Sequence, residues 1–266
     1  MPSLRRSLLR RYRLFAPYLL RHGLVLLLLL LVGDAFSVFY FPQLKTALSL
    51  STAPTPGPTA STSAPNLAAM TTGLATDVMA SDTFQRPDQH YWGLASDGHP
   101  WLADAHSERN FVIFEHTGVI EATPQHVYCN ALLGPAMTNS EITFTASLGH
   151  YGPSTLGAVL RWSDAHNFYA LTLDGQRLSL DRVMDGMQIP LQSAPFPARD
   201  GALYTFRFRA IGAQLFAMVW PTGQPAPATW QVSASDSAFA SGQAGLHVLV
   251  QQSTQARITA FEEVQL

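Results

Sequence analysis

Carboxylate pairs that could hydrolyse a glycosidic bond are the first chemistry sought along this chain. Two carboxyl groups two residues apart on a strand point to the same side, and retaining hydrolysis needs them about 5–5.5 Å apart. The sequence has no such alternating run; the nearest approaches are Asp181 with Asp185 and the adjacent Glu262 and Glu263, which would point to opposite faces of a strand. Because exposed acids explain both pairs, we expect a protein without catalytic carboxylates and therefore not an enzyme.

Other catalytic and metal-binding motifs are also missing from the sequence. It contains neither a G-x-S-x-G nucleophile motif nor a P-loop. Its His residues form no H-x-H or H-E-x-x-H pattern, and Cys129 is the single Cys. We therefore expect no zinc site, and we predict that Cys129, which lies in the apolar run 127–133, is a small buried hydrophobic residue.

Aromatic side chains are the remaining groups that could recognise a ligand. Sugar rings stack on Trp and Tyr faces, while Asp, Asn, Arg or Gln bind their hydroxyls. Trp162 and Tyr169 flank a polar loop that contains Asp164 and Asn167. Because loops at the ends of strands often carry recognition groups, we predict these four as ligand-binding residues. The alternative is that the rings pack in the core and that Asp164 and Asn167 shape the turn.

The elements that must position these residues are β-strands, because apolar and polar residues alternate from Ser81 onward. In the segment 141–148, for example, Ile142, Phe144, Ala146 and Leu148 share one face. Further strands are predicted at 111–115, 127–132, 156–162, 168–174, 177–184, 204–209, 214–220, 230–234, 246–250 and 257–264. Asp-Gly pairs at 174–175 and 185–186 predict tight turns. The pattern indicates an all-β fold, a two-sheet antiparallel jelly-roll sandwich.

Three groups of residues give the chain a family resemblance. They are DTFQRPD (82–88) with YWG (91–93), SDG (96–98) and Trp101; RWSD (161–164) with NFY (167–169) and LDG (173–175); and GQAGLHV (242–248) with RITAF (257–261). In these groups the segment 82–266 resembles concanavalin A-like (LamG-like) sandwich domains of bacterial and phage surface proteins. The resemblance implies that the first and last strands, near Asp82 and Phe261, are neighbours. It leaves the function open, because this fold hosts lectins, glycanases, adhesion modules and spacers.

The resemblance also implies a metal site. Concanavalin A-like domains often hold a structural calcium ion between their terminal strands. In this chain the matching carboxylates are Asp82 with Glu262 or Glu263. Calcium takes six to eight oxygen ligands, so further ligands would be needed.

The first 80 residues predict a membrane tether. Seven of the 16 basic residues lie up to Lys45, with Asp34 as the single acid there. A helix over 22–44 would reach about 35 Å, enough for a hydrocarbon core of about 30 Å, and its Leu and Val run outweighs the cost of Asp34, about 2.5–3.5 kcal/mol. We predict a basic cytoplasmic tip (1–21), a transmembrane signal anchor (22–44), a Ser/Thr/Pro/Ala-rich linker (45–80) and a sandwich domain (81–266). The alternative is a signal peptide that is cleaved, leaving a secreted protein.

Charge and organisation together define the expected function. Beyond Lys45 the chain has no Lys and an excess of acids, which argues against nucleic acid as a partner. We expect a single-pass protein of the cell membrane whose extracytoplasmic domain binds a carbohydrate or another surface ligand without catalysis. The alternatives are a structural adhesion or spacer module with no small ligand, and a divergent glycoside hydrolase of the concanavalin A-like superfamily.

Overall fold

Apolar residues at every second position fold the chain into two layers of strands. The computed structural model describes residues 77–122, 128–251 and 254–266. The predicted tip, the anchor and most of the linker therefore lie outside the described residues. None of the helices in those three ranges has the length and apolar character needed to cross a membrane.

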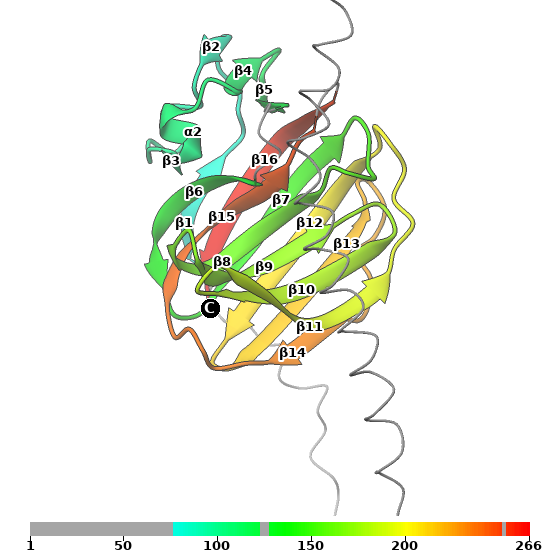
Figure 1. Ribbon diagram of the computed structural model, residues 1–266. Coiled ribbons are helices and arrows are strands. Elements are labelled where there is room, and N and C mark those ends of the chain that lie inside the picture. The colour runs from blue at the N-terminus through cyan, green and yellow to red at the C-terminus, as the bar shows by residue number, and fades with distance from the viewer. Residues whose placement is uncertain (1–76, 123–127, 252–253) are drawn as a thin grey trace, which may run out of the picture. The chain divides into compact units, whose positions relative to one another are not determined.

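The described strands form two antiparallel sheets, stacked as layers in Figure 1. The nine-stranded sheet has the order β14 (Val232–Ser235), β13 (Gln214–Pro221), β12 (Leu203–Ile211), β7 (Ser140–Leu148), β16 (Gln255–Gln265), β5 (Thr117–Glu121), β4 (Phe111–Phe114) and β2 (Gln89–His90), with β1 (Val78–Asp82) paired to β16. The seven-stranded sheet has the order β11 (Met187–Pro195), β10 (Arg177–Met184), β9 (Asn167–Leu173), β8 (Leu156–Asp164), β15 (Gly242–Leu249), β6 (Tyr128–Met137) and β3 (Leu102–Ala103). A single short helix, α2 (Asp104–Ser107), is described beside them. The two-sheet, all-β architecture predicted from the sequence is confirmed.

The main core lies between the two sheets. Phe144 on β7 and Phe206 on β12 stack with ring centroids 4.5 Å apart, and they are cross-strand partners. Leu171 on β9 and Leu180 on β10 are fully buried in the same cluster from the opposite sheet. Since the inner faces supply these side chains from both layers, burial of apolar area holds the sheets together.

Most strand positions agree with the alternation in the sequence, but β5, β11 and the short strands β1 to β3 were not predicted from it. The strand β11 lacks a clear alternation of apolar and polar residues, because it contains Pro190, Pro195 and several polar residues. Proline lacks an N–H group, so it is tolerated in an edge strand, and β11 lies at the edge of the seven-stranded sheet. The strand β1 begins at Val78, within the predicted linker, and pairs Asp82 with Phe261, which confirms that the first and last strands are neighbours.

Two buried charged groups are satisfied by networks of hydrogen bonds. Asp82 accepts two hydrogen bonds from the Arg86 guanidinium, at 2.8 and 3.0 Å, and one from Trp101 Nε1 at 2.7 Å. Arg161, which is 3% exposed, donates to the backbone carbonyl oxygens of Thr138, Gly212 and Phe239. Arg161 therefore connects three turns at one end of the sandwich, where a buried charge requires such partners.

Glu263 is a buried acid without such partners. It lies on β16 opposite Ala80 of β1, is 0% exposed, and neither of its carboxyl oxygens has a hydrogen-bond partner among the described residues. Burial raises the pKa of Glu263 from an ordinary value of 4.5 to about 8. The carboxyl group is therefore protonated in the folded protein at neutral pH, because a neutral acid loses less solvation on burial than an ion does.

Replacing this acid should change how stability depends on pH. The folded state holds the Glu263 proton between pH 4.5 and about 8, whereas the unfolded chain releases it. Its contribution to stability is therefore full below pH 4.5 and is lost as the pH rises to about 8. The variant Glu263→Gln stays neutral at every pH. We therefore expect its free energy of unfolding, relative to that of the wild type, to rise by on the order of a few kcal/mol between pH 4.5 and about 8.

The measurement is denaturant unfolding of both proteins at several pH values. Glu262→Gln on the same strand is the matched control, because Glu262 is exposed and should leave the pH dependence unchanged. A constant difference between wild type and Glu263→Gln from pH 5 to 8 would contradict the assignment of a neutral acid.

Candidate functional site

The strand β9, an interior strand of the seven-stranded sheet, presents different side chains to its two faces. Tyr169, Leu171 and Leu173 point into the main core, whereas Phe168 and Thr172 lie on the outer face of the seven-stranded sheet. The next strand, β10, follows the same alternation, with Leu178 and Leu180 in the core and Ser179 and Asp181 outside. Polar side chains from neighbouring strands therefore meet on this outer face.

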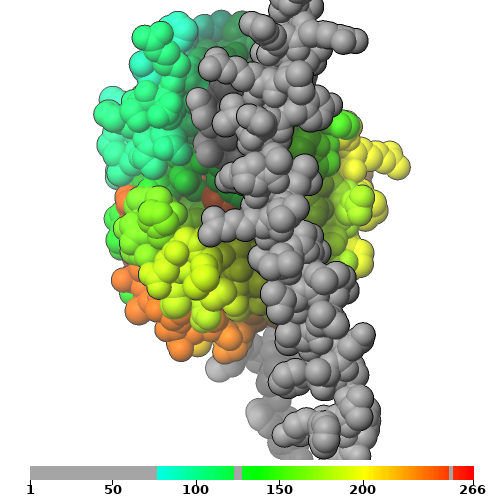
Figure 2. Space-filling view, viewed as in Figure 1, coloured from blue at the N-terminus to red at the C-terminus, as the bar shows by residue number. Residues whose placement is uncertain are grey.

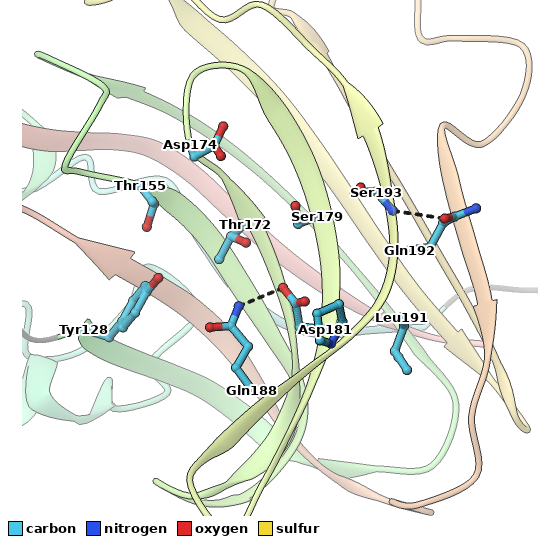
Figure 3. A pocket seen from close by; sticks show the side chains of 11 residues that line it. Tyr128, Thr155, Thr172, Asp174, Ser179, Asp181, Gln188, Leu191, Gln192 and Ser193 are labelled. Carbon is cyan, nitrogen blue, oxygen red and sulfur yellow. Dashed lines mark hydrogen bonds between the residues drawn. The ribbon is translucent and has the colours of Figure 1, made fainter. Parts of the chain in front are cut away.

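These polar side chains surround a hollow of about 440 Å³, which we call the outer groove. Its lining residues come from the strands β6, β9, β10 and β11, from the position before β8 and from the turn after β9 (Figure 3). The β10–β11 hairpin that forms one wall appears in yellow-green at the surface in Figure 2. The lining residues are Tyr128, Thr155, Thr172, Asp174, Ser179, Asp181, Gln188, Pro190, Leu191, Gln192 and Ser193.

Asp181 is the buried carboxylate of the outer groove. It is only 3% exposed and accepts a hydrogen bond from Gln188 Nε2 at 3.0 Å, drawn in Figure 3. Burial raises the pKa of Asp181 above its usual value, and the hydrogen bond from Gln188 offsets part of that shift. A carboxylate with so few donors around it is a strong acceptor for the hydroxyl or amine of a ligand.

Hydroxyl groups form the floor of the outer groove. Ser179 and Thr172 are directly opposite each other on β10 and β9. Thr155 is 9% exposed, and its Oγ1 is buried without a hydrogen-bond partner among the described residues. Since an unpaired buried hydroxyl costs about 1–3 kcal/mol, a ligand that bonds to Thr155 would recover this energy.

Tyr128 supplies an aromatic surface at one end of the outer groove. Its ring stacks on the His247 ring with centroids 4.1 Å apart and planes 7° apart, and it stays 36% exposed. The His247 ring is fixed by two neighbours. Its Nδ1 lies 2.7 Å from Asn130 Oδ1, and it makes an edge-to-face contact with the Phe168 ring. One face of the Tyr128 ring is therefore supported by the protein, and the exposed part can stack on a sugar ring.

His247 is neutral in this setting. Burial lowers its pKa from 6.5 to about 3, so the imidazole carries a single proton at physiological pH. Because Asn130 Oδ1 can only accept, that proton lies on Nδ1. A neutral ring supports Tyr128 through stacking without adding positive charge to this face.

Trp162 lies on the same outer face as the groove. It packs against a second apolar cluster formed by Leu132, Val159, Phe168, Ala170 and Val183. Its Nε1 is buried without a hydrogen-bond partner among the described residues. Of the four residues predicted to bind ligand, Trp162 is thus the one whose side chain packs on this outer face, although it does not line the outer groove.

Tyr169 has a different position from the one expected of a binding residue. It is 0% exposed, and its hydroxyl donates to Asp236 Oδ1 at 2.6 Å while the same hydroxyl oxygen accepts from the Phe239 N–H at 3.2 Å. Burial and the hydrogen bond to Asp236 raise its pKa to about 12. The ring belongs to the main core and has no free face for a ligand.

Asp164 and Asn167 shape the turn between β8 and β9. Asp164 Oδ1 accepts from the His166 N–H at 2.8 Å and from Asn167 Nδ2 at 3.0 Å. Asn167 Oδ1 accepts from the Asp185 N–H at 3.1 Å and so joins two neighbouring turns. This arrangement matches the alternative interpretation of the sequence, in which the two residues are structural.

The carboxylates matched to a calcium site are not brought together. The Asp82 oxygens accept hydrogen bonds from Arg86 and Trp101, Glu262 is exposed, and Glu263 faces the interior. Over the ranges that the structure describes, no three His, Cys, Asp or Glu side chains gather closely enough to hold a metal ion. A guanidinium takes the position at Asp82 where a cation would bind.

The comparisons with known proteins inform the fold. No family model matches this chain, and no curated protein matches it. A xylan beta-1,4-xylosidase from Bacillus halodurans C-125 superposes with a TM-score of 0.50 at 11% identity, over 69% of this chain and 38% of the xylosidase. The GH43 BlXynB protein from Bacillus licheniformis gives a TM-score of 0.50 at 12% identity, over 70% of this chain and 39% of that protein.

A single-module protein is also similar. The carbohydrate-binding module CBM66 from Bacillus subtilis aligns with a TM-score of 0.46 at 14% identity, over 69% of this chain and 94% of the module. This chain spans about two fifths of the two glycosidase structures above. At such low identity the likeness to the two glycosidase structures shows the β-sandwich fold alone, compatible with a jelly roll.

Sequence reasoning missed the residues that form the outer groove. Tyr128 lies within the apolar run 127–133 and carries no motif, and Thr155 lies outside the named strands. The one available signal was Asp181, an acid at a position of β10 where polar residues alternate with Leu178 and Leu180. That alternation predicts an outward side chain but not its burial.

The role of Tyr169 can be tested through stability. We expect Tyr169→Phe to lower the free energy of unfolding by about 1–2 kcal/mol, because the Asp236 and Phe239 groups lose their hydrogen-bond partner. Chemical denaturation provides the measurement, with Tyr91→Phe as control because no hydrogen bond of the Tyr91 hydroxyl is described. An unchanged stability would show that the hydroxyl is not part of the core network.

Proposed function

We propose that this protein is a membrane-tethered, concanavalin A-like module that binds a carbohydrate outside the cytoplasm, through the outer groove and without catalysis. The observation that carries the proposal is the pairing of a supported aromatic ring, Tyr128 on His247, with two polar groups around one hollow: the buried carboxylate of Asp181, which accepts from Gln188, and the unpartnered hydroxyl of Thr155. Sugars present both an apolar ring face and many hydroxyls, and this combination matches both.

The spacing of acids in the groove supports a non-catalytic role. Its two carboxylates are Asp174 and Asp181. Asp181 pairs with Ala170 on β9, and Asp174, four residues after Ala170, follows the end of that strand, so the two acids are about 13 Å apart along the sheet. Glycosidases place their two carboxyl groups about 5–9.5 Å apart, whether they retain or invert.

Removal of the aromatic surface should weaken binding. We expect Tyr128→Ala to lower affinity for a bound oligosaccharide by roughly 10- to 100-fold, since burying an aromatic side chain contributes about 1.5–3 kcal/mol. Tyr128→Phe keeps the ring and should stay near wild type. Calorimetric titration with cellohexaose, xylohexaose and N-acetylchitohexaose would measure these affinities.

Met187→Ala is the matched control for this titration, because Met187 is 65% exposed and does not line the groove. Binding that survives Tyr128→Ala unchanged would exclude this site. An absence of binding across neutral, amine-bearing and acidic oligosaccharides would favour a spacer without a small ligand.

The membrane tether is proposed from residues 22–44 and can be tested separately. A reporter enzyme that needs disulfides, fused after Leu266, should be active in intact cells because its compartment is oxidising. The same reporter fused after Arg21 should stay inactive in the reducing cytoplasm. Activity of the second fusion alone would reverse the proposed orientation.

A further inference from the structure

Three other buried or partly buried acids of the described domain differ from Asp181 in how their charge is balanced. Asp82 is paired with Arg86 at 2.8 Å, and Asp236 with Arg182 at 2.7 Å. Glu141 is shared by the guanidinium groups of Arg207 and Arg209. Burying a carboxylate without a cation is costly, and in these three places an arginine offsets the cost.

Asp181 has no such arginine. No described basic side chain forms an ion pair with it, and its hydrogen bond comes from the neutral amide of Gln188. Glu263 is also unpaired, but it is enclosed in the interior, whereas Asp181 lines a hollow of about 440 Å³. The space beside Asp181 is therefore open to a positive group that the protein itself does not supply.

A second, independent feature points to a ligand in the same place. Thr155 is nine-tenths buried, lines the groove and has a hydroxyl without a partner among the described residues. The side chains of Thr155, Thr172 and Ser179 are uncharged. They can therefore bind sugar hydroxyls while Asp181 binds a positively charged group. The groove thus combines hydroxyl recognition with a single buried negative charge.

We propose that the outer groove selects amine-bearing sugars, with the ammonium group bound to Asp181 and the neighbouring hydroxyls bound to Thr155, Thr172 and Ser179. This inference rests on the carbohydrate-binding function proposed above and specifies its ligand class. Sugars that carry carboxylates or phosphates are excluded from the position beside Asp181, because two like charges in a buried site repel strongly.

The remaining charges on this face leave the selection intact. Asp174 lies at the other end of the groove and adds a second negative charge there. Arg177 shares the outer face, but its guanidinium donates to Ser193 Oγ at 2.6 Å. Its backbone position is four residues from Asp181, about 13 Å along β10, so screening and distance weaken its effect at Asp181.

Paired oligosaccharides that differ in one group test the proposal. The probes are glucosamine hexamer, its fully N-acetylated counterpart and an oligogalacturonate, titrated into the full-length protein in mildly acidic buffer. We expect the free-amine hexamer to bind about fivefold or more tightly than the acetylated one, because a charge-assisted hydrogen bond replaces a neutral one. The acidic oligomer should not bind measurably.

The variant Asp181→Asn removes the charge while keeping the shape. We expect it to abolish the preference for the amine while hydroxyl-dependent binding of the acetylated hexamer persists. Asp185→Asn in the turn after β10 is the matched control, because Asp185 is exposed outside the groove and should leave the preference unchanged.

The outcomes separate the two proposals. Equal affinity for the amine and acetylated hexamers in the wild type, or an amine preference that persists in Asp181→Asn, overturns the charge selection while carbohydrate binding stands. Tight binding of the oligogalacturonate overturns it as well. Absence of binding by all three probes and by the neutral oligosaccharides overturns both proposals.

Discussion

The two-sided burial of strand β9 is the constraint on which the rest of this sandwich depends. Leu171 on its inner face is fully buried in the main core, and Phe168 on its outer face belongs to a second apolar cluster. A shift of one residue would exchange the two sets, so both clusters oppose it. The register of β9 then places Thr172 opposite Ser179 and Ala170 opposite Asp181. The geometry of the outer groove follows from this register.

Buried polar groups are handled in three different ways in this domain. Asp82 and Arg161 are satisfied by networks that join distant segments. Glu263 is accommodated by keeping its proton. The groups of the outer groove, Asp181 and Thr155, are left incompletely bonded. Because the first two solutions are internally complete, the third is the place where a ligand gains most from binding.

Structural similarity to other proteins indicates the fold of this domain, whereas the residues of the outer groove indicate its ligand. The glycosidases that superpose on this chain are more than twice as long as the region they share with it, at 11% and 12% identity. A β-sandwich supports many functions, so that likeness cannot assign one. A carbohydrate ligand is proposed instead from Tyr128, Asp181 and Thr155, which line one hollow.

From the sequence alone, the alternation of apolar and polar residues predicted the strands, and the Asp-Gly pairs predicted the turns. The resemblance to concanavalin A-like domains predicted that Asp82 and Phe261 lie on neighbouring strands. Local order is readable because alternation and turn chemistry act within a few residues. The sequence did not predict which aromatic rings are exposed. Tyr169 and Tyr128 look alike in sequence, yet one is closed into the core and the other stacks on His247 at the surface. That difference arises only when strands distant in sequence are placed side by side, because burial depends on what the neighbouring strands cover.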